Sequence, residues 1–90
     1  MRLKVKVEGD KLVIENTADE PVFLLQLEVK YRLHVSSIED GTVIKYVSHS
    51  IPVNEEVVAR KEIPLDVPDV SEVTVTYRLG NEKFQETHET

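Results

Sequence analysis

The sequence predicts an all-β protein, an antiparallel two-sheet sandwich of about seven strands. Strand-favouring aliphatic residues dominate, since Val, Ile and Leu number 15, 5 and 8 and Ala only 2. Apolar and polar residues alternate along most of the chain, which is the period of a strand with one buried face. Turn-forming residues interrupt the alternation at regular intervals, as in sandwiches. A small barrel is the alternative architecture.

The length is sufficient for one domain and too short for two. Dividing 90 residues (10.3 kDa) would leave each half too small to bury its own core. We therefore expect a single sandwich domain over residues 1–90. No stretch of ten residues has the 3.6-residue period of a helix, so none is expected. The chain has no Cys, which excludes disulfides and thiol-based sites.

The first 21 residues predict a β-hairpin followed by a polar connection. Two alternating apolar segments within residues 2–16 flank a turn at Gly9. Lys4 and Lys6 suit a first strand at a sheet edge, where charged side chains oppose edge-to-edge pairing. The connection over residues 16–21 ends in a proline, which blocks strand continuation.

The strongest strand signal covers residues 23–35. Every odd position is apolar: Phe23, Leu25, Leu27, Val29, Tyr31, Leu33 and Val35. At about 3.3 Å per residue this strand spans roughly 43 Å, whereas a globule of this size is roughly 31 Å across. We expect that a bulge bends the strand so that it serves both sheets. The alternative is a hairpin tip that overhangs the body and exposes apolar surface.

A returning strand over residues 42–48 completes this long hairpin, with a turn at residues 36–41. If odd positions of one strand pair with even positions of the other, Ile44 and Tyr46 join the core face. Val43, Lys45 and Val47 would then lie outside, beside Arg32 and His34.

The rest of the chain predicts further strands separated by breaks. Residues 49–56 suggest a loop or crossing segment, and residues 57–65 a strand. Alternation over residues 73–79 defines the next strand. Residues 83–87 form a final strand with Phe84 as its apolar anchor.

This arrangement resembles the immunoglobulin-like and fibronectin type III-like β-sandwich superfamily. The likeness is carried by residues 12–16, the turn leading to Pro21, the long apolar strand after it and residues 72–79. The paired Cys and central Trp of antibody-type domains are absent. The resemblance implies a binding or spacer unit.

The net charge indicates which classes of partner are disfavoured. A net charge of −6 disfavours nucleic acid, because binding phosphates needs many Lys and Arg. The acidic excess lies after residue 45. No apolar run could span a membrane. Without a signal peptide or a glycosylation sequon, we expect a cytoplasmic protein. Scarce thermolabile residues and 31% charged residues favour a thermophilic source.

Histidines and carboxylates offer little chemistry. His34, His49 and His88 fall on a strand, in a loop and in the terminal tail, with no spacing that makes them converge. Glu86, His88 and Glu89 could hold a metal only weakly in a flexible tail. We therefore predict no metal-ligating residues.

Nucleophiles and phosphate loops are equally poorly represented. Ser48 and Ser50 flank His49, but neighbours in sequence do not form a catalytic triad. Glycine occurs only at positions 9, 41 and 80, so no glycine-rich phosphate loop exists. We predict no catalytic or cofactor-binding residues, no cofactor and no enzymatic activity.

We predict a non-catalytic interaction or structural module. It would contact a protein partner, or its own copy as a homodimer, through a sheet edge or the long 23–48 hairpin. The predicted partner-binding residues are Arg32, His34, Ile38, Val43, Lys45 and Val47. The alternative is a small anion- or carbohydrate-binding domain that uses a basic strip on this hairpin, formed by Lys30, Arg32, His34 and Lys45.

Overall fold

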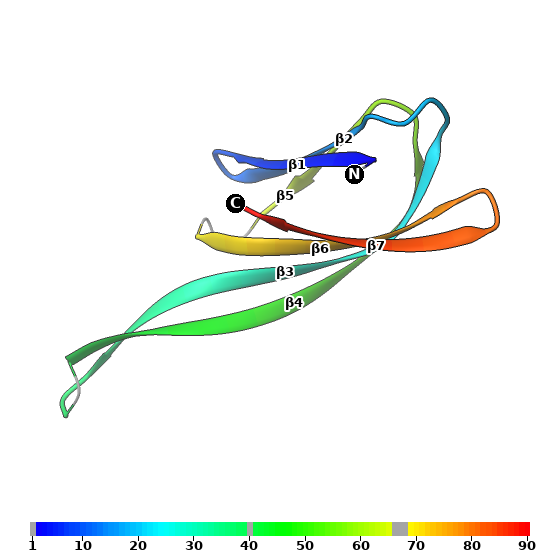
Figure 1. The fold of residues 1–90 in the computed structure, drawn as a ribbon. Helices are drawn as coiled ribbons and strands as arrows, with labels where there is room; N and C mark the ends of the chain where they lie inside the picture. Colours follow the sequence, from blue (N-terminus) through cyan, green and yellow to red (C-terminus); the bar gives the residue numbers. More distant parts are fainter. Residues whose placement is uncertain (1, 40, 66–68) are drawn as a thin grey trace.

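The computed structural model describes residues 2–39, 41–65 and 69–90 and confirms a two-sheet antiparallel arrangement. One sheet has the strand order β1-β2-β5 and the other β4-β3-β6-β7 (Figure 1). Every element within the described ranges is a strand. The strands are β1 (Leu3–Glu8), β2 (Lys11–Asn16), β3 (Val22–Ser37), β4 (Gly41–Val57), β5 (Arg60–Pro64), β6 (Val70–Leu79) and β7 (Glu82–Glu89).

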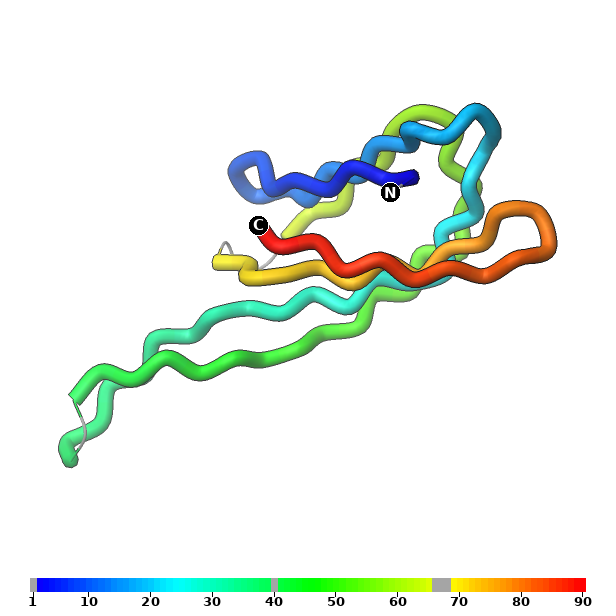
Figure 2. Tube along the Cα trace, viewed as in Figure 1, coloured from blue at the N-terminus to red at the C-terminus, as the bar shows by residue number. Residues whose placement is uncertain are grey.

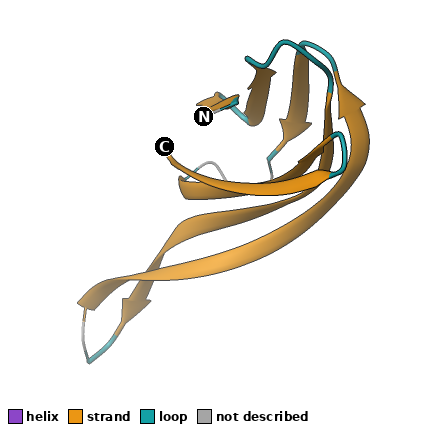
Figure 3. Cartoon of the chain, turned by 45° about the vertical axis from the view of Figure 1, so that its right-hand side comes forward, coloured by secondary structure: helices purple, strands orange, loops and turns teal. Residues whose placement is uncertain are grey.

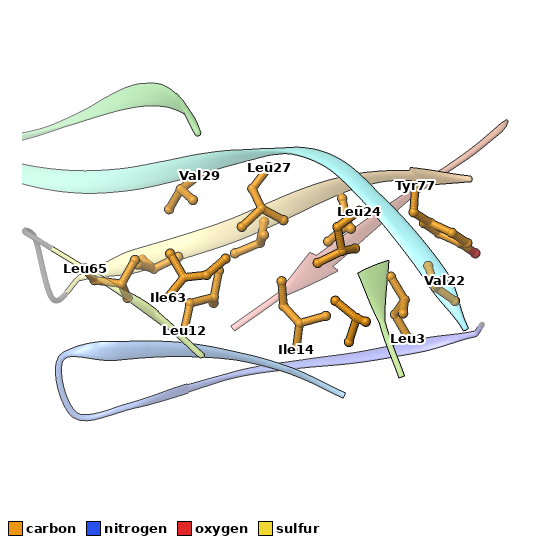
Figure 4. Close-up of a cluster of buried hydrophobic side chains, with 14 of the residues drawn as sticks. Leu3, Leu12, Ile14, Val22, Leu24, Leu27, Val29, Ile63, Leu65 and Tyr77 are labelled. Atoms are coloured by element: carbon orange, nitrogen blue, oxygen red, sulfur yellow. The ribbon is translucent and has the colours of Figure 1, made fainter. Parts of the chain in front are cut away.

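The hydrophobic core lies between the two sheets. Leu12 and Ile14 of β2 face Leu24, Leu27 and Val29 of β3 across the interface (Figure 4). Each of these side chains is fully buried, and burying one aliphatic side chain contributes about 1.5–3 kcal/mol. The β1–β2 hairpin and β3 both contribute side chains to this core, as the alternation of apolar residues predicts.

A bulge in β3 changes the predicted alternation at the start of this strand. The register of β3 against both β4 and β6 shifts between Leu24 and Gln26. Val22 and Leu24 are therefore buried, whereas Phe23 is only half-buried on the other face. From Leu27 to Tyr31 the odd positions are buried as predicted, whereas Leu33 and Val35 lie on the same side of the sheet but are exposed. The expected inward orientation of residues 23 and 25 is wrong, because the extra residue in the strand reverses the phase of the pleat.

The register of the β3–β4 hairpin differs from the expected one. Odd residues pair with odd residues, so Leu33 lies opposite Lys45 and Val35 opposite Val43. Opposite residues share a face. Lys45, like Val43 and Val47, therefore lies on the core-side face of the sheet. Ile44 and Tyr46 lie on the outer face with Arg32 and His34.

Three other boundaries correct the sequence-based prediction. Residues 49–56 are not a loop, because β4 runs without interruption to Val57. The predicted strand over residues 57–65 is broken by a bend at residues 58 and 59. His88 lies within β7 and not in a tail. Of the break predicted at residues 66–69, positions 66–68 lie outside the described residues, and Asp69 lies outside any strand.

The outer face of the smaller sheet is covered by ion pairs. Val13 is the central residue of this face and has no solvent exposure. Lys6 contacts Glu8 and Glu15 at 3.1 and 3.4 Å, and Arg60 bridges Glu8 and Glu62 on the other side of Val13. The aliphatic stems of such residues cover apolar surface while their charges stay in water. β1 is an edge strand, as Lys4 and Lys6 predicted.

The molecule is elongated because the β3–β4 hairpin extends beyond the rest of the sandwich (Figures 1 and 2). Its principal extents are 53 × 24 × 20 Å and its radius of gyration is 15.0 Å, against about 12 Å for a compact chain of this length. The bulge and the overhang, predicted as alternatives, are both present. β3 nevertheless belongs to one sheet only.

Asn16 connects three parts of the chain at one end of the sandwich. Its side-chain nitrogen donates to the carbonyl oxygens of Glu20, Val57 and Val58 at 2.9, 3.0 and 3.2 Å. Its side-chain oxygen accepts from the Ala18 amide at 2.8 Å. One side chain thus joins the end of β2, the connection to β3 and the bend between β4 and β5.

Asn16→Ala should lower the free energy of unfolding by about 2 kcal/mol, because carbonyl groups lose their donor. Asn16→Asp keeps the acceptor for Ala18 but removes the donor, and should destabilise at least as much. Urea denaturation measures both values. An Asn16→Asp variant as stable as the wild type would show that the side-chain donor contributes nothing.

Candidate functional site

The overhanging end of the β3–β4 hairpin is the most unusual surface of the molecule. We call it the arm and define it as residues 33–39 and 41–45. β6 pairs with β3 as far as Tyr31, so beyond the hairpin's base β3 and β4 pair only with each other among the described strands. In Figure 3 the two strands curve away from the body together.

Both faces of the arm and its base expose apolar side chains. Leu33 and Val35 are each 37% exposed on the core-side face. Ile44 and Tyr46 are 53% and 59% exposed on the outer face. Ile38 at the tip is fully exposed. Exposed apolar side chains gathered in one region are typical of interaction surfaces.

The outer edge of β4 is free, because β4 ends its sheet. The amide of Arg32 donates to Asp69, so even residues of β3 direct their backbone groups toward β6 and odd residues toward β4. With the observed register, odd residues of β4 bond back to β3. The backbone groups of its even residues therefore point to the free edge: Thr42, Ile44, Tyr46, Ser48 and Ser50.

The four edge strands differ in how they are protected. β1 carries Lys4, Lys6 and Glu8 within six residues, and β5 has three charged residues and a proline within five. β7 has four charged residues among eight. In β4, by contrast, Lys45 is the single formal charge of residues 41–51. Charged and proline residues are the usual protection against strand addition, so the β4 edge is the least protected.

The structure separates the predicted partner-binding residues onto two faces. Arg32 and His34 lie on the outer face, whereas Val43, Lys45 and Val47 lie on the core-side face. Ile38 projects at the tip of the hairpin. The six residues belong to one hairpin, but they do not form a single patch.

The basic strip is not a free cluster of cations. Lys30 pairs with Glu72 at 3.2 Å and Arg32 with Asp69 at 2.8 Å. His34 also lies 3.5 Å from Asp69. The hydrogen bond that Arg32 donates to Asp69 raises the pKa of the Arg32 guanidinium. Lys45 lies on the opposite face, so the expectation that it neighbours this strip is wrong.

Sequence reasoning missed Tyr46 as an exposed aromatic residue. The expected register placed it in the core, whereas it lies beside Lys30, whose ammonium is 5.9 Å from the ring centroid. A surface pocket of about 310 Å³ adjoins these residues and is also lined by Glu72 and Glu89. Only the parity of the hairpin turn could have identified Tyr46, because a one-residue slip moves each side chain to the other face.

A second cluster, around Glu86, closes the sandwich where β1 meets β7. The Glu86 carboxylate accepts from the Tyr77 hydroxyl and from the Arg2 amide at 3.1 Å, and it contacts His88 at 2.9 Å. The guanidinium of Arg2 lies 4.3 Å from the centre of the Phe84 ring. These contacts join the two sheets at one edge.

Burial and hydrogen bonding act in opposite directions on the pKa values of this cluster. Burial alone would raise the pKa of Glu86, but the hydrogen bonds from Tyr77, Arg2 and His88 hold it below its ordinary value. Burial and the bond to Glu86 raise the pKa of Tyr77. The cluster therefore favours an ionised Glu86 beside a neutral Tyr77.

Two searches of the described residues, for metal-ligating clusters and for membrane-spanning helices, find neither. In the described part of the chain, no three His, Asp or Glu side chains converge to hold a metal ion. The described elements also include no helix long and apolar enough to cross a membrane.

Comparison of the chain with protein-family models, curated proteins and solved structures finds no match.

Shortening the arm should leave the fold almost unchanged. Leu33 and Lys45 bond to each other through their backbones, so Asn-Gly can replace residues 34–44 as a two-residue hairpin turn. Because the removed residues lie outside the core, we expect the free energy of unfolding to change by less than about 1 kcal/mol. Leu27→Ala, a fully buried control, should cost about 3 kcal/mol. Urea denaturation compares the two, and a loss from shortening as large as that of the control would place the arm in the stabilising core.

Glu86→Gln should reduce the dependence of stability on acid pH. The pKa of Glu86 is lower in the folded chain than its ordinary value of 4.5. Its contribution is therefore present above pH 4.5 and is lost as the pH falls through the folded value. At pH 7 we expect Glu86→Gln to cost about 1–3 kcal/mol, and this difference from the wild type should shrink in acid.

Thermal unfolding measured between pH 2 and pH 7 tests this prediction. Glu89→Gln removes an exposed carboxylate of the same strand and controls for the loss of one negative charge. A difference between Glu86→Gln and the wild type that stays constant over this range would contradict it.

Proposed function

We propose that this protein is a non-catalytic interaction module that binds a protein partner by strand addition at the β4 edge. The observation that carries the proposal is an edge of eleven residues, 41–51, with free backbone groups and one formal charge. Added strands gain affinity from main-chain hydrogen bonds, and side-chain pockets at alternate positions give specificity. Apolar groups on both faces of the arm supply surface for such contacts.

We also propose a relationship to the immunoglobulin-like and fibronectin type III-like sandwiches, many of which are binding or spacer units. Three-plus-four strands with β2 and β3 in different sheets support it. The fourth strand pairs with the third, whereas in constant-type immunoglobulin domains it belongs to the other sheet. The observed order therefore favours the fibronectin type III-like side of the superfamily.

The alternative function, anion or carbohydrate binding, has one supporting observation. Tyr46 is an exposed ring beside a pocket that contains Lys30 and Arg32. Both cations already pair with carboxylates, and Glu72 and Glu89 line the same pocket. Acidic groups oppose anions, so an uncharged sugar is the ligand that this surface would fit better. The free edge extends over more of the molecule, and we therefore favour strand addition.

Ser48→Pro tests strand addition without disturbing the hairpin. The Ser48 amide points to the free edge, so a proline there removes an edge donor and leaves the bonds to β3 in place. Pro52 already occupies a position of the same phase in β4. We expect unchanged stability within about 1 kcal/mol and loss of the partner that the wild type retains.

The measurement compares immobilised wild-type, Ser48→Pro and Ser48→Ala proteins for the proteins that each retains from lysate of the native source, including its own copy. Ser48→Ala is the matched control, because it changes the same side chain and keeps the amide. A folded Ser48→Pro variant that retains everything the wild type retains would contradict the proposal.

A further inference from the structure

We propose that the occupant of the β4 edge is a second copy of this chain, paired with the first about a two-fold axis through Tyr46. This inference rests on the proposed function of the edge and names its partner. Two copies joined in this way would form one continuous eight-stranded sheet, with the axis normal to it. Symmetric dimers are the commonest homo-oligomers, and their interfaces are made by the same surface on both subunits.

The positions of Gly41 and Pro52 set the length of the edge that can pair. β4 begins at Gly41, and Pro52 has the even phase that faces the free edge but no amide hydrogen. The residues able to exchange bonds are the five even residues between them, from Thr42 to Ser50. Their midpoint is Tyr46. An axis there pairs Tyr46 with Tyr46 of the second copy, Ile44 with its Ser48 and Thr42 with its Ser50.

Neighbouring registers pair fewer residues. An axis normal to the sheet returns each face to itself, so only registers that keep the parity of the pleat are possible. An axis at residue 47 pairs Thr42 with a proline, which has no donor. An axis at residue 45 places Lys45 directly opposite Lys45 of the second copy, and like charges in that position are destabilising. The Tyr46 register avoids both.

The side chains that this register brings together are compatible. On the outer face the two Tyr46 rings are opposite each other, and aromatic cross-strand pairs are stabilising. On the core-side face, Lys45 lies opposite Val47 of the second copy and Val43 opposite its His49. The one formal charge of the segment therefore lies directly opposite an apolar side chain, and Lys45 of the second copy occupies the more distant diagonal position.

Charge and surface area are also consistent with self-association. Each chain carries a net charge of −6, yet residues 41–51 contribute none of the negative charge. Two acidic molecules can therefore approach through this edge with little local repulsion. The chain exposes 5882 Å², about 500 Å² more than the roughly 5,400 Å² of a compact chain of its mass. An area of this size buried on both copies would reach about 1,000 Å², the lower limit for a specific interface.

Cysteine cross-linking tests the register directly, because the natural chain contains no Cys. In Tyr46→Cys the two thiols are directly opposite, within the Cα separation of about 4.4–6.8 Å that a disulfide requires. In Ser48→Cys each thiol lies opposite Ile44, and the two thiols are four residues, or about 13 Å, apart. Under mild oxidation we expect Tyr46→Cys to form covalent dimers at least roughly tenfold faster than Ser48→Cys, which is too distant to bridge.

Two solution measurements accompany the cross-linking. Sedimentation equilibrium of the wild type should show a dimer, and Tyr46→Lys should weaken it by roughly tenfold or more, since like charges then meet on the axis. Val58→Lys, a charge at another exposed apolar residue outside the arm, should have no effect. Hydrogen exchange should slow at Ile44, Tyr46 and Ser48 as the protein concentration rises, because those amides bond only in the dimer.

Each result supports or overturns the inference. Fast cross-linking of Tyr46→Cys alone, with a dimer sensitive to Tyr46→Lys, supports it. Equal cross-linking of Ser48→Cys, a monomeric wild type or a dimer insensitive to Tyr46→Lys overturns it. Self-pairing would be refuted, and the proposed function left intact, by one combination of results. In it the wild type is a monomer and retains a different protein from the lysate, and Ser48→Pro does not retain that protein. Failure of both tests would refute both.

Discussion

The rest of the structure depends on the backbone ladder of β3, which pairs with β4 on one side and β6 on the other. This strand supplies Leu24, Leu27 and Val29 to the core and positions the four-stranded sheet against the smaller one. Its two neighbours differ in length: β4 follows it to the end, whereas β6 stops pairing at Tyr31. The arm exists because the hairpin continues where the third strand does not.

The burial of the β3 side chains follows from this difference between the lengths over which β4 and β6 pair with β3. Along β3 the core-side residues change from fully buried at Val29 to 37% exposed at Leu33, although their side chains are of the same apolar kind. The smaller sheet does not reach the end of the hairpin, so the described strands cover Leu33 only in part (Figure 1). Backbone bonds between β3 and β4 maintain the strand geometry in the absence of a core. The β4 edge, with one formal charge in residues 41–51, thereby continues from the body onto the arm, where a second strand can reach it.

The other edges of the two sheets carry more charged side chains than the β4 edge. The smaller sheet carries a nearly complete layer of ion pairs over Val13, and β7 has charged residues along its length. At the junction of β1 and β7 the Glu86 cluster joins the sheets through polar contacts. The described edges of the body are thus protected by charge, and the β4 edge, which has the least of this protection, is where we propose that binding occurs.

The sequence alone determined the fold class, because alternation over residues 23–35 and the hairpin turns depend on local chemistry. It also indicated that the third strand is too long for a compact body. It could not determine on which side of the sheet Leu25 and Tyr46 lie. A bulge in a strand, or one more residue in a turn, moves the following side chains to the other side of the sheet, and the pattern of residue types does not reveal either change. Tertiary structure decided three further features, since each depends on residues distant in the chain. They are the contact of Glu86 with Arg2, the pairing of Arg32 with Asp69, and which residues of β4 direct their backbone groups to the free edge.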